Sequence, residues 1–151
     1  MINLNNTLLL GHRGARGEAV ENTLAGFEHA QRLNPQGLAG VEFDVQLSAD
    51  EQLIVFHDDN LQRMCGQQSR IDQLTLAEIQ RYRQDKHPLI TLDRAYQALT
   101  NFSYIELEIK THERTNYTQL VHALTRNLLD TPIASLPFVL TSFDTELHAR
   151  L

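Results

Sequence analysis

The chain has 151 residues, 42% hydrophobic and 21% charged, a composition typical of one globular domain, which we place at residues 1–151. Its net charge is −6 and it has no basic patch, which argues against nucleic acid and anionic membranes as partners. An anionic substrate would need a cation or a few well-placed basic side chains.

Predicted strands and helices alternate along most of the chain. Short apolar or alternating runs predict five strands, at residues 7–10, 41–47, 53–56, 104–110 and 138–140. Apolar stripes with helical spacing predict helices at residues 24–33, 76–82, 92–99, 117–129 and 144–151. Asn22 or Thr23 is the expected N-cap of the first helix, and residues 59–74 are expected to be irregular. This alternation predicts βα units around a parallel sheet.

The cysteine content and the N-terminal residues bear on location. The single cysteine, Cys65, cannot form an internal disulfide, which fits a reducing compartment. The first residues lack a basic segment followed by a long apolar run, so we expect neither a signal peptide nor a membrane span there. We therefore expect a cytoplasmic protein.

Side chains that could carry chemistry gather near the ends of four predicted strands. They are two imidazoles, four carboxylates and one amine: His12, Glu42, Asp44, His57, Glu106, Glu108 and Lys110. In α/β sheets and barrels, functional groups collect at the carboxyl ends of parallel strands. We therefore expect these side chains to share one rim of the sheet.

The carboxylates on this rim predict a divalent cation. Uncompensated charges inside a barrel cost several kcal/mol each, so they need a counter-ion. Mg²⁺ and Ca²⁺ prefer oxygen ligands, and two or three carboxylates from neighbouring strands suit them. Zn²⁺ fits less well, because the histidines lack ligand spacing and Cys65 falls in a loop.

Simpler interpretations exist for each residue. Glu42 and Asp44 could form the solvated face of an edge strand, and a single histidine at a strand end is often a capping or hydrogen-bonded group. Arg13 could pair with a nearby glutamate (Glu18 or Glu21), and Lys110 could be a solvated charge at a strand end. We expect the remaining histidines to be surface residues: His29, His87, His112, His122 and His148.

Several motifs, in a fixed order, resemble the glycerophosphodiester phosphodiesterase family. They are GHRG at 11–14, ENTLAGF at 21–27, VEFDVQLS at 41–48, HDDNLQR at 57–63, LTLAEI at 74–79, PLITLDRAYQAL at 88–99, ELEIK at 106–110 and TSFD at 141–144. The resemblance implies a TIM-type (β/α) barrel. It also implies metal-dependent hydrolysis of glycerophosphodiesters to sn-glycerol 3-phosphate and an alcohol.

The resemblance also implies a role for each motif residue. His12 and His57 correspond to the general acid–base pair, and Arg13 and Lys110 to the phosphate-binding residues. Glu42, Asp44 and Glu108 correspond to the ligands of Mg²⁺ or Ca²⁺, and Glu21 and Asn22 to supporting residues. The sequence leaves two points open: which histidine is the acid, and whether water or the glycerol 2-hydroxyl attacks phosphorus.

The chain is shorter than the family's barrel. A complete TIM barrel takes about 250 residues, so we expect about five of eight βα units and an incomplete barrel. The chain would then be part of a longer enzyme, or a natural short form that pairs its open sheet edges with a second copy or another partner. Two other functions stay open: a related, phospholipase-like barrel phosphodiesterase, or an inactive truncated barrel that acts as a binding or assembly module.

Overall fold

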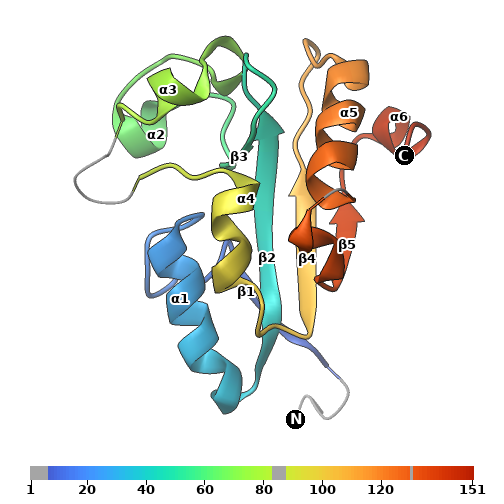
Figure 1. Ribbon diagram of the computed structural model, residues 1–151. Helices are drawn as coiled ribbons and strands as arrows, with labels where there is room; N and C mark the ends of the chain where they lie inside the picture. The colour runs from blue at the N-terminus through green and yellow to red at the C-terminus, as the bar shows by residue number, and fades with distance from the viewer. Residues whose placement is uncertain (1–6, 83–87, 130) are drawn as a thin grey trace.

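The computed structural model describes residues 7–82, 88–129 and 131–151, and its centre is one twisted sheet. Four strands run parallel in the order β1 (Leu9–His12), β2 (Leu38–Leu47), β4 (Tyr104–Ile109) and β5 (Phe138–Thr141) (Figure 1). The fifth strand, β3 (Leu53–Val55), pairs with the end of β2. Within the described residues the sheet does not close into a barrel, so the expected incomplete barrel of α/β type is confirmed.

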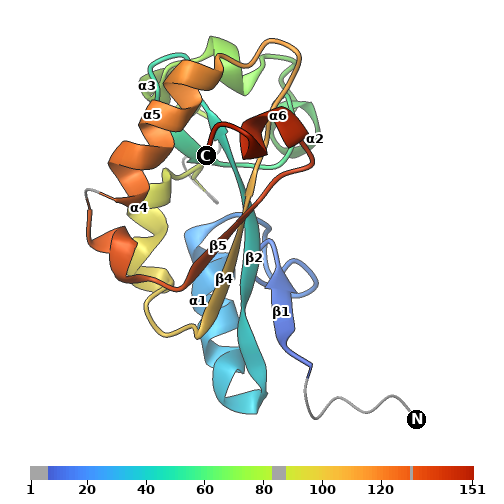
Figure 2. The ribbon, with the colours of Figure 1, turned by 90° about the vertical axis from the view of Figure 1, so that its right-hand side faces the viewer.

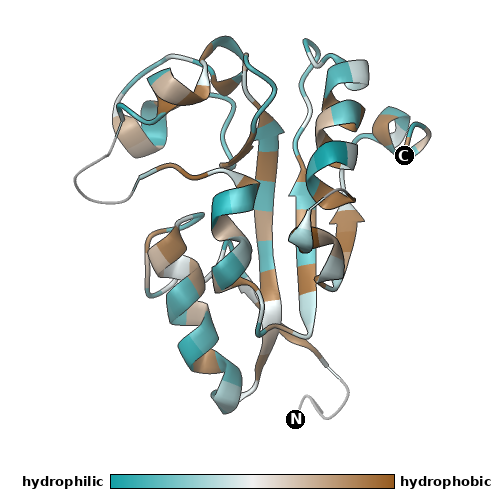
Figure 3. Cartoon of the chain, viewed as in Figure 1, coloured by the Kyte–Doolittle hydropathy of each residue, from teal (hydrophilic) through white to brown (hydrophobic). Residues whose placement is uncertain are grey.

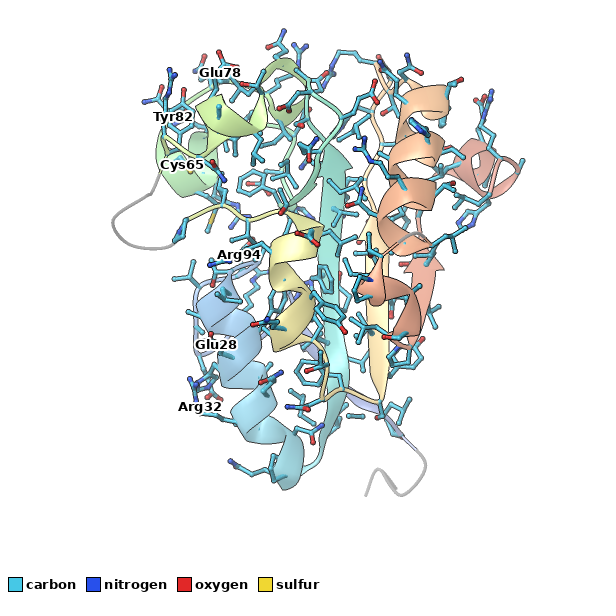
Figure 4. The ribbon with its side chains drawn as sticks, in the orientation of Figure 1. Glu28, Arg32, Cys65, Glu78, Tyr82 and Arg94 are labelled. Atoms are coloured by element: carbon cyan, nitrogen blue, oxygen red, sulfur yellow. The ribbon has the colours of Figure 1, made fainter. Side chains whose placement is uncertain are left out.

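Helices from three parts of the chain lie on one face of this sheet. Figure 2 shows α1 (Leu24–Leu33), α4 (Leu92–Ala95) and α5 (Tyr117–Leu128) on the same side of the strands. Other elements complete the described chain: α2 (Gln62–Cys65), α3 (Leu76–Ile79), α6 (Thr145–His148), and the 3₁₀ turns η1 (Asn34–Gln36), η2 (Ile71–Gln73), η3 (Tyr96–Ala98) and η4 (Pro132–Ser135). The outer side of α1 carries Glu28 and Arg32, both exposed (Figure 4).

Alternation along the strands places the core between sheet and helices. The apolar residues of β2 and β4 are fully buried: Val41, Phe43, Val45, Ile105, Leu107 and Ile109. Figure 3 shows hydrophobic and hydrophilic residues alternating along β2 and β4. The Phe43 ring packs 4.9 Å from that of Phe27 on α1, centroid to centroid. Each such side chain contributes about 1.5–3 kcal/mol through burial, which fixes which face of the sheet turns outward.

The helix starts follow the expected capping chemistry. Thr23 is the N-cap of α1, and its hydroxyl accepts a hydrogen bond from the Gly26 amide at 3.1 Å. Thr75 and Glu78 form a reciprocal capping box at the start of α3. Of the two expected caps for α1, the structure thus selects Thr23 and leaves Asn22 for another role.

The third strand was expected to be one of the parallel strands, and this was wrong. β3 pairs antiparallel with β2, Val45 lying opposite Val55. Only residues 48–52 connect the two strands, whereas a parallel crossover needs a dozen or more residues. The connection therefore allows only a hairpin.

The segment after β3 is more ordered than the sequence suggested. Residues 59–74 contain α2 and η2 in place of an irregular loop. A second, smaller core forms there because Leu61 and Ile71 of this stretch meet buried apolar residues from neighbouring parts of the chain: Ile54, Phe56, Ile79 and Leu89. In the part of the chain that the structure describes, no helix has both the length and the apolar character that a membrane span requires.

Candidate functional site

Strand register brings three of the predicted carboxylates together. Asp44 of β2 lies opposite Glu108 of β4, and Glu42 lies one pleat earlier on the same face. One carboxylate oxygen from each residue lies within 4.8 Å of the others. This face is the one turned away from the core, as the alternation with buried apolar residues requires. The interpretation of Glu42 and Asp44 as a solvated edge is wrong, since β2 lies between β1 and β4 and Asp44 is 1% exposed.

The end of β1 and the tight turn that follows it bring His12 and Arg13 to the same place. His12 is in register with Glu42, and its Nε2 lies 3.6 Å from Glu42 Oε2. The Arg13 amide donates to Glu42 Oε2 at 3.1 Å, with Arg13 in the left-handed region at φ 52°. A Cβ at Gly11 would lie 1.9 Å from the Gly14 carbonyl oxygen, so the turn needs glycine at that position.

Basic and amide side chains surround Asp44. Lys110 Nζ lies 3.1 Å from Asp44 Oδ1 and 2.5 Å from Glu108 Oε1. Arg13 Nε lies 3.4 Å from Asp44 Oδ2, and the Asn22 amide donates to the same oxygen at 3.0 Å. Lys110 is therefore not a solvated charge, and Asn22 holds a site carboxylate instead of capping α1.

Arg13 is also held from a second direction. Its Nη1 donates to Glu21 Oε1 at 2.9 Å, so one of the two expected simple pairings for Arg13 does form. Glu21 lies in the loop before α1, as does Asn22, which sits at φ 54°. Left-handed backbone at non-glycine residues is uncommon, and two instances beside one carboxylate cluster are typical of a functional site.

The clustered charges perturb one another. Burial, together with the Asp44 and Glu108 charges, raises the pKa of Glu42 to about 7. Burial opposes the charged form of Lys110, but its bonds to Glu108 and Asp44 outweigh this and raise its pKa. Partial burial and the Arg13 and Arg16 charges lower the pKa of His12. Burial and like-charge repulsion therefore both oppose the ionised form of Glu42.

These residues fit a divalent cation by their donor chemistry. Glu42, Asp44 and Glu108 supply only oxygen, the ligand atom that Mg²⁺ and Ca²⁺ prefer. Next to Asp44, the buried side-chain oxygen of Asn22 accepts no hydrogen bond. A cation would offset the repulsion that raises the pKa of Glu42.

The segment that carries His57 is hydrogen-bonded to β2 beside Asp44. The Phe56 amide donates to the Asp44 carbonyl at 3.1 Å, which anchors the chain just before His57. The Gln46 amide donates to the carbonyls of Phe56, at 3.0 Å, and Asp58, at 2.8 Å. The His57 ring itself pairs with Asp58, Nδ1 to Oδ1, at 2.7 Å.

Sequence reasoning missed several residues here. Gln46 lies two residues after Asp44 on the same strand face, so its spacing could have identified it. His112 was expected at the surface, yet it is half-buried, with Nε2 3.4 Å from both Gln46 Oε1 and Asp59 Oδ1. Its place two residues after Lys110, at a strand end, was an available signal. His87 lies outside the described residues.

The comparison with known proteins decides the family. The model of the glycerophosphoryl diester phosphodiesterase family matches residues 12–143, nearly the whole chain. The chain belongs to this family. The match includes every site residue named above.

The relatives that match this chain are longer proteins, and the match covers only part of each. A glycerophosphodiester phosphodiesterase of Caldanaerobacter subterraneus is 39% identical over 75 residues, which are 50% of this chain and 30% of that protein. A human lysophospholipase D is 40% identical over 73 residues, 48% of this chain and 22% of the relative.

Solved structures of the family agree with the fold. An Oleispira antarctica phosphodiesterase in complex with the product sn-glycerol-3-phosphate superposes with a TM-score of 0.82 at 28% identity, covering 94% of this chain and 60% of that one. A glycerophosphodiester phosphodiesterase from Thermotoga maritima gives a TM-score of 0.74 at 28% identity, covering 93% and 55%. The chain thus spans little more than half of these proteins.

Proposed function

We propose that the chain carries the catalytic residues of a metal-dependent glycerophosphodiester phosphodiesterase, which hydrolyses glycerophosphodiesters to sn-glycerol 3-phosphate and an alcohol. The observation that carries this proposal is the cluster of Glu42, Asp44 and Glu108 oxygens within 4.8 Å, in a chain of this family. The activity for which the relatives are named, and the product bound to one of them, support the same reaction.

The residues around the cluster suit an anionic substrate. Glu42, Asp44 and Glu108 would hold Mg²⁺ or Ca²⁺, and such a cation offsets phosphodiester charge and stabilises the charge that develops during displacement. Arg13 and Lys110 add positive charge beside the same carboxylates, where they can bind the phosphate oxygens. Glu21 and Asn22 hold Arg13 and Asp44 in place.

Two histidines from different strand ends supply proton transfer. In-line displacement at phosphorus needs a base for the attacking oxygen and an acid for the leaving oxygen. His12 is the last residue of β1, and His57 follows the β2–β3 hairpin. The imidazole ring of histidine can both accept and donate a proton, so this side chain can serve in either role.

A chelation experiment tests the metal requirement. The chain, stripped of divalent cations with EDTA, should not release sn-glycerol 3-phosphate from glycerophosphocholine, and added Mg²⁺ or Ca²⁺ should restore release. The control is EDTA pre-saturated with the added cation, which should leave turnover unchanged. Turnover that persists in excess EDTA contradicts the metal assignment.

A lysophospholipase D activity is the second candidate, because the human relative carries that name. A pocket of about 200 Å³ beside Lys110 has mostly polar residues in its lining, Gln46 and His112 among them, and its small volume suits a small alcohol better than an acyl chain. Parallel assays with glycerophosphocholine and lysophosphatidylcholine separate the two activities. Faster turnover of the acylated substrate favours the second candidate.

Three further properties stay predictions. A single domain over residues 1–151 and a cytoplasmic location rest on composition and on the lone cysteine. Association with a second copy is suggested by the edge strands β1 and β5 and by Phe143, which is 94% exposed. Light scattering of the chain measures that association directly. A stable, inactive monomer that binds glycerol phosphate would favour the binding-module alternative.

A further inference from the structure

Arg63, the second residue of α2, bridges two carboxylates from different parts of the chain. Its Nε and Nη2 donate to Asp58 at 2.7 and 3.0 Å. Its Nη1 and Nη2 donate to Glu21 at 3.1 and 2.6 Å. This double, forked contact uses the planar geometry of the guanidinium group, which a lysine amine cannot reproduce.

Each of these carboxylates also contacts a residue of the proposed site. Asp58 Oδ1 lies 2.7 Å from His57 Nδ1, and Glu21 Oε1 lies 2.9 Å from Arg13 Nη1. The contacts therefore run without a break from His57 through Asp58, Arg63 and Glu21 to Arg13. They join the segment after β3 to the loop between β1 and α1.

Both carboxylates in this series are ionised at neutral pH. Hydrogen bonds from Arg63 and Arg13 lower the pKa of Glu21 to about 2, against the opposing effect of burial. Burial raises the pKa of Asp58, but its hydrogen bonds with Arg63 and His57 outweigh this and lower it. An ionised carboxylate only accepts hydrogen bonds, so the His57 nitrogen that faces Asp58 must carry the proton.

We infer that Arg63 is a positioning residue: through Asp58 it fixes the Nδ1–H tautomer and the ring orientation of His57, and through Glu21 it ties His57 to the Arg13 turn. Nε2 of His57 is then the nitrogen left for proton transfer. The consequence for turnover rests on the proposed function, whereas the tautomer is a property of the chain alone. The competing explanation is an ordinary surface ion pair, since the Arg63 side chain is 46% exposed.

Imidazole NMR on the ¹⁵N-labelled chain tests the positioning role without any substrate. The unmodified chain should show a solvent-protected Nδ1–H resonance for His57. Arg63→Met and Asp58→Asn should lose that resonance through exchange, and Arg63→Lys should restore it only in part. Arg70→Met is the matched control, because Arg70 is an arginine of the same region whose ion pair is with Asp72. Circular dichroism checks that each variant folds. If Arg63→Met does not fold, the comparison uses Arg63→Lys instead.

Turnover of glycerophosphocholine provides the second measurement. Loss of a group that orients a catalytic side chain costs about 10–100-fold, so kcat of Arg63→Met should fall by that factor with KM nearly unchanged. An ordinary ion pair predicts unchanged kcat in the folded variant. A His57 Nδ1–H resonance that persists in Arg63→Met overturns the inference. If the resonance behaves as expected but no variant hydrolyses glycerophosphodiesters, the proposed function fails and the positioning of His57 stands.

Discussion

Replacing Glu42 with glutamine should stabilise the metal-free chain at high pH, although it removes a proposed cation ligand. In the folded chain, burial and the charges of Asp44 and Glu108 raise the pKa of Glu42 from 4.5 to about 7. Glutamine cannot ionise, keeps the shape, and can still accept the hydrogen bond from the Arg13 amide. The variant thus removes the repulsion with little change in packing.

The sign and size follow from proton linkage. Below pH 4.5 both the folded and the unfolded chain hold the Glu42 proton, so the ionisation of this residue does not lower the free energy of unfolding. Between pH 4.5 and about 7 the unfolded chain releases the proton first, and the free energy of unfolding falls as pH rises. One pKa unit is worth about 1.4 kcal/mol, so the full loss above pH 7 is about 3 kcal/mol at most. Glu42→Gln should escape this loss.

Urea unfolding followed by circular dichroism, in EDTA at pH 4 and pH 8, measures the difference. The free energy of unfolding of Glu42→Gln should exceed that of the unmodified chain by about 2–3 kcal/mol at pH 8 and by little at pH 4. Added Ca²⁺ or Mg²⁺ should stabilise the unmodified chain more than the variant. The matched control is Glu106→Gln, which removes a charge from the same strand face next to the cluster. This explanation is refuted if Glu42→Gln is no more stable than the unmodified chain at pH 8, or if its gain in stability is the same at both pH values.

Three further predictions concern catalysis, backbone and core. His12→Gln and His57→Gln should each lower kcat for glycerophosphocholine by about 100-fold or more while circular dichroism stays unchanged; a fully active variant removes that histidine from the mechanism. Asn22→Ala should be less stable to urea than Asn22→Gly by about 1 kcal/mol, because only glycine accepts φ 54° without strain; equal stability would show that the backbone relaxes. Phe43→Ala should cost about 3–5 kcal/mol, because its fully buried ring packs on Phe27, and a cost below 1 kcal/mol would contradict that packing.

Local patterns in the sequence were enough to predict most of the elements and the carboxylate cluster. Period-two alternation placed β2 and β4 with the apolar face inward, and this also placed Glu42, Asp44 and Glu108 on one opposite face. The apolar stripe predicted α5 at residues 117–129, and the helix runs from Tyr117 to Leu128. Such features depend on neighbours within a few residues, so the sequence displays them directly.

The direction of β3 and the order of residues 59–74 were mispredicted for different reasons. The five-residue connection before β3 already excluded a parallel crossover, so that signal was present and overlooked. The second core was less visible, because Leu61 and Ile71 stand apart in a polar stretch. Their burial depends on meeting Ile54 and Ile79 from other elements.

The sequence by itself determined the family motifs, the alternating strands and the residue types at the strand ends. Only the tertiary structure decided which charges touch, because contact between distant elements depends on register and on how the loops pack. It placed Lys110 between Asp44 and Glu108, which raised the pKa of that lysine. It also joined Arg63 to Glu21, 42 positions earlier, a pairing that no local pattern encodes.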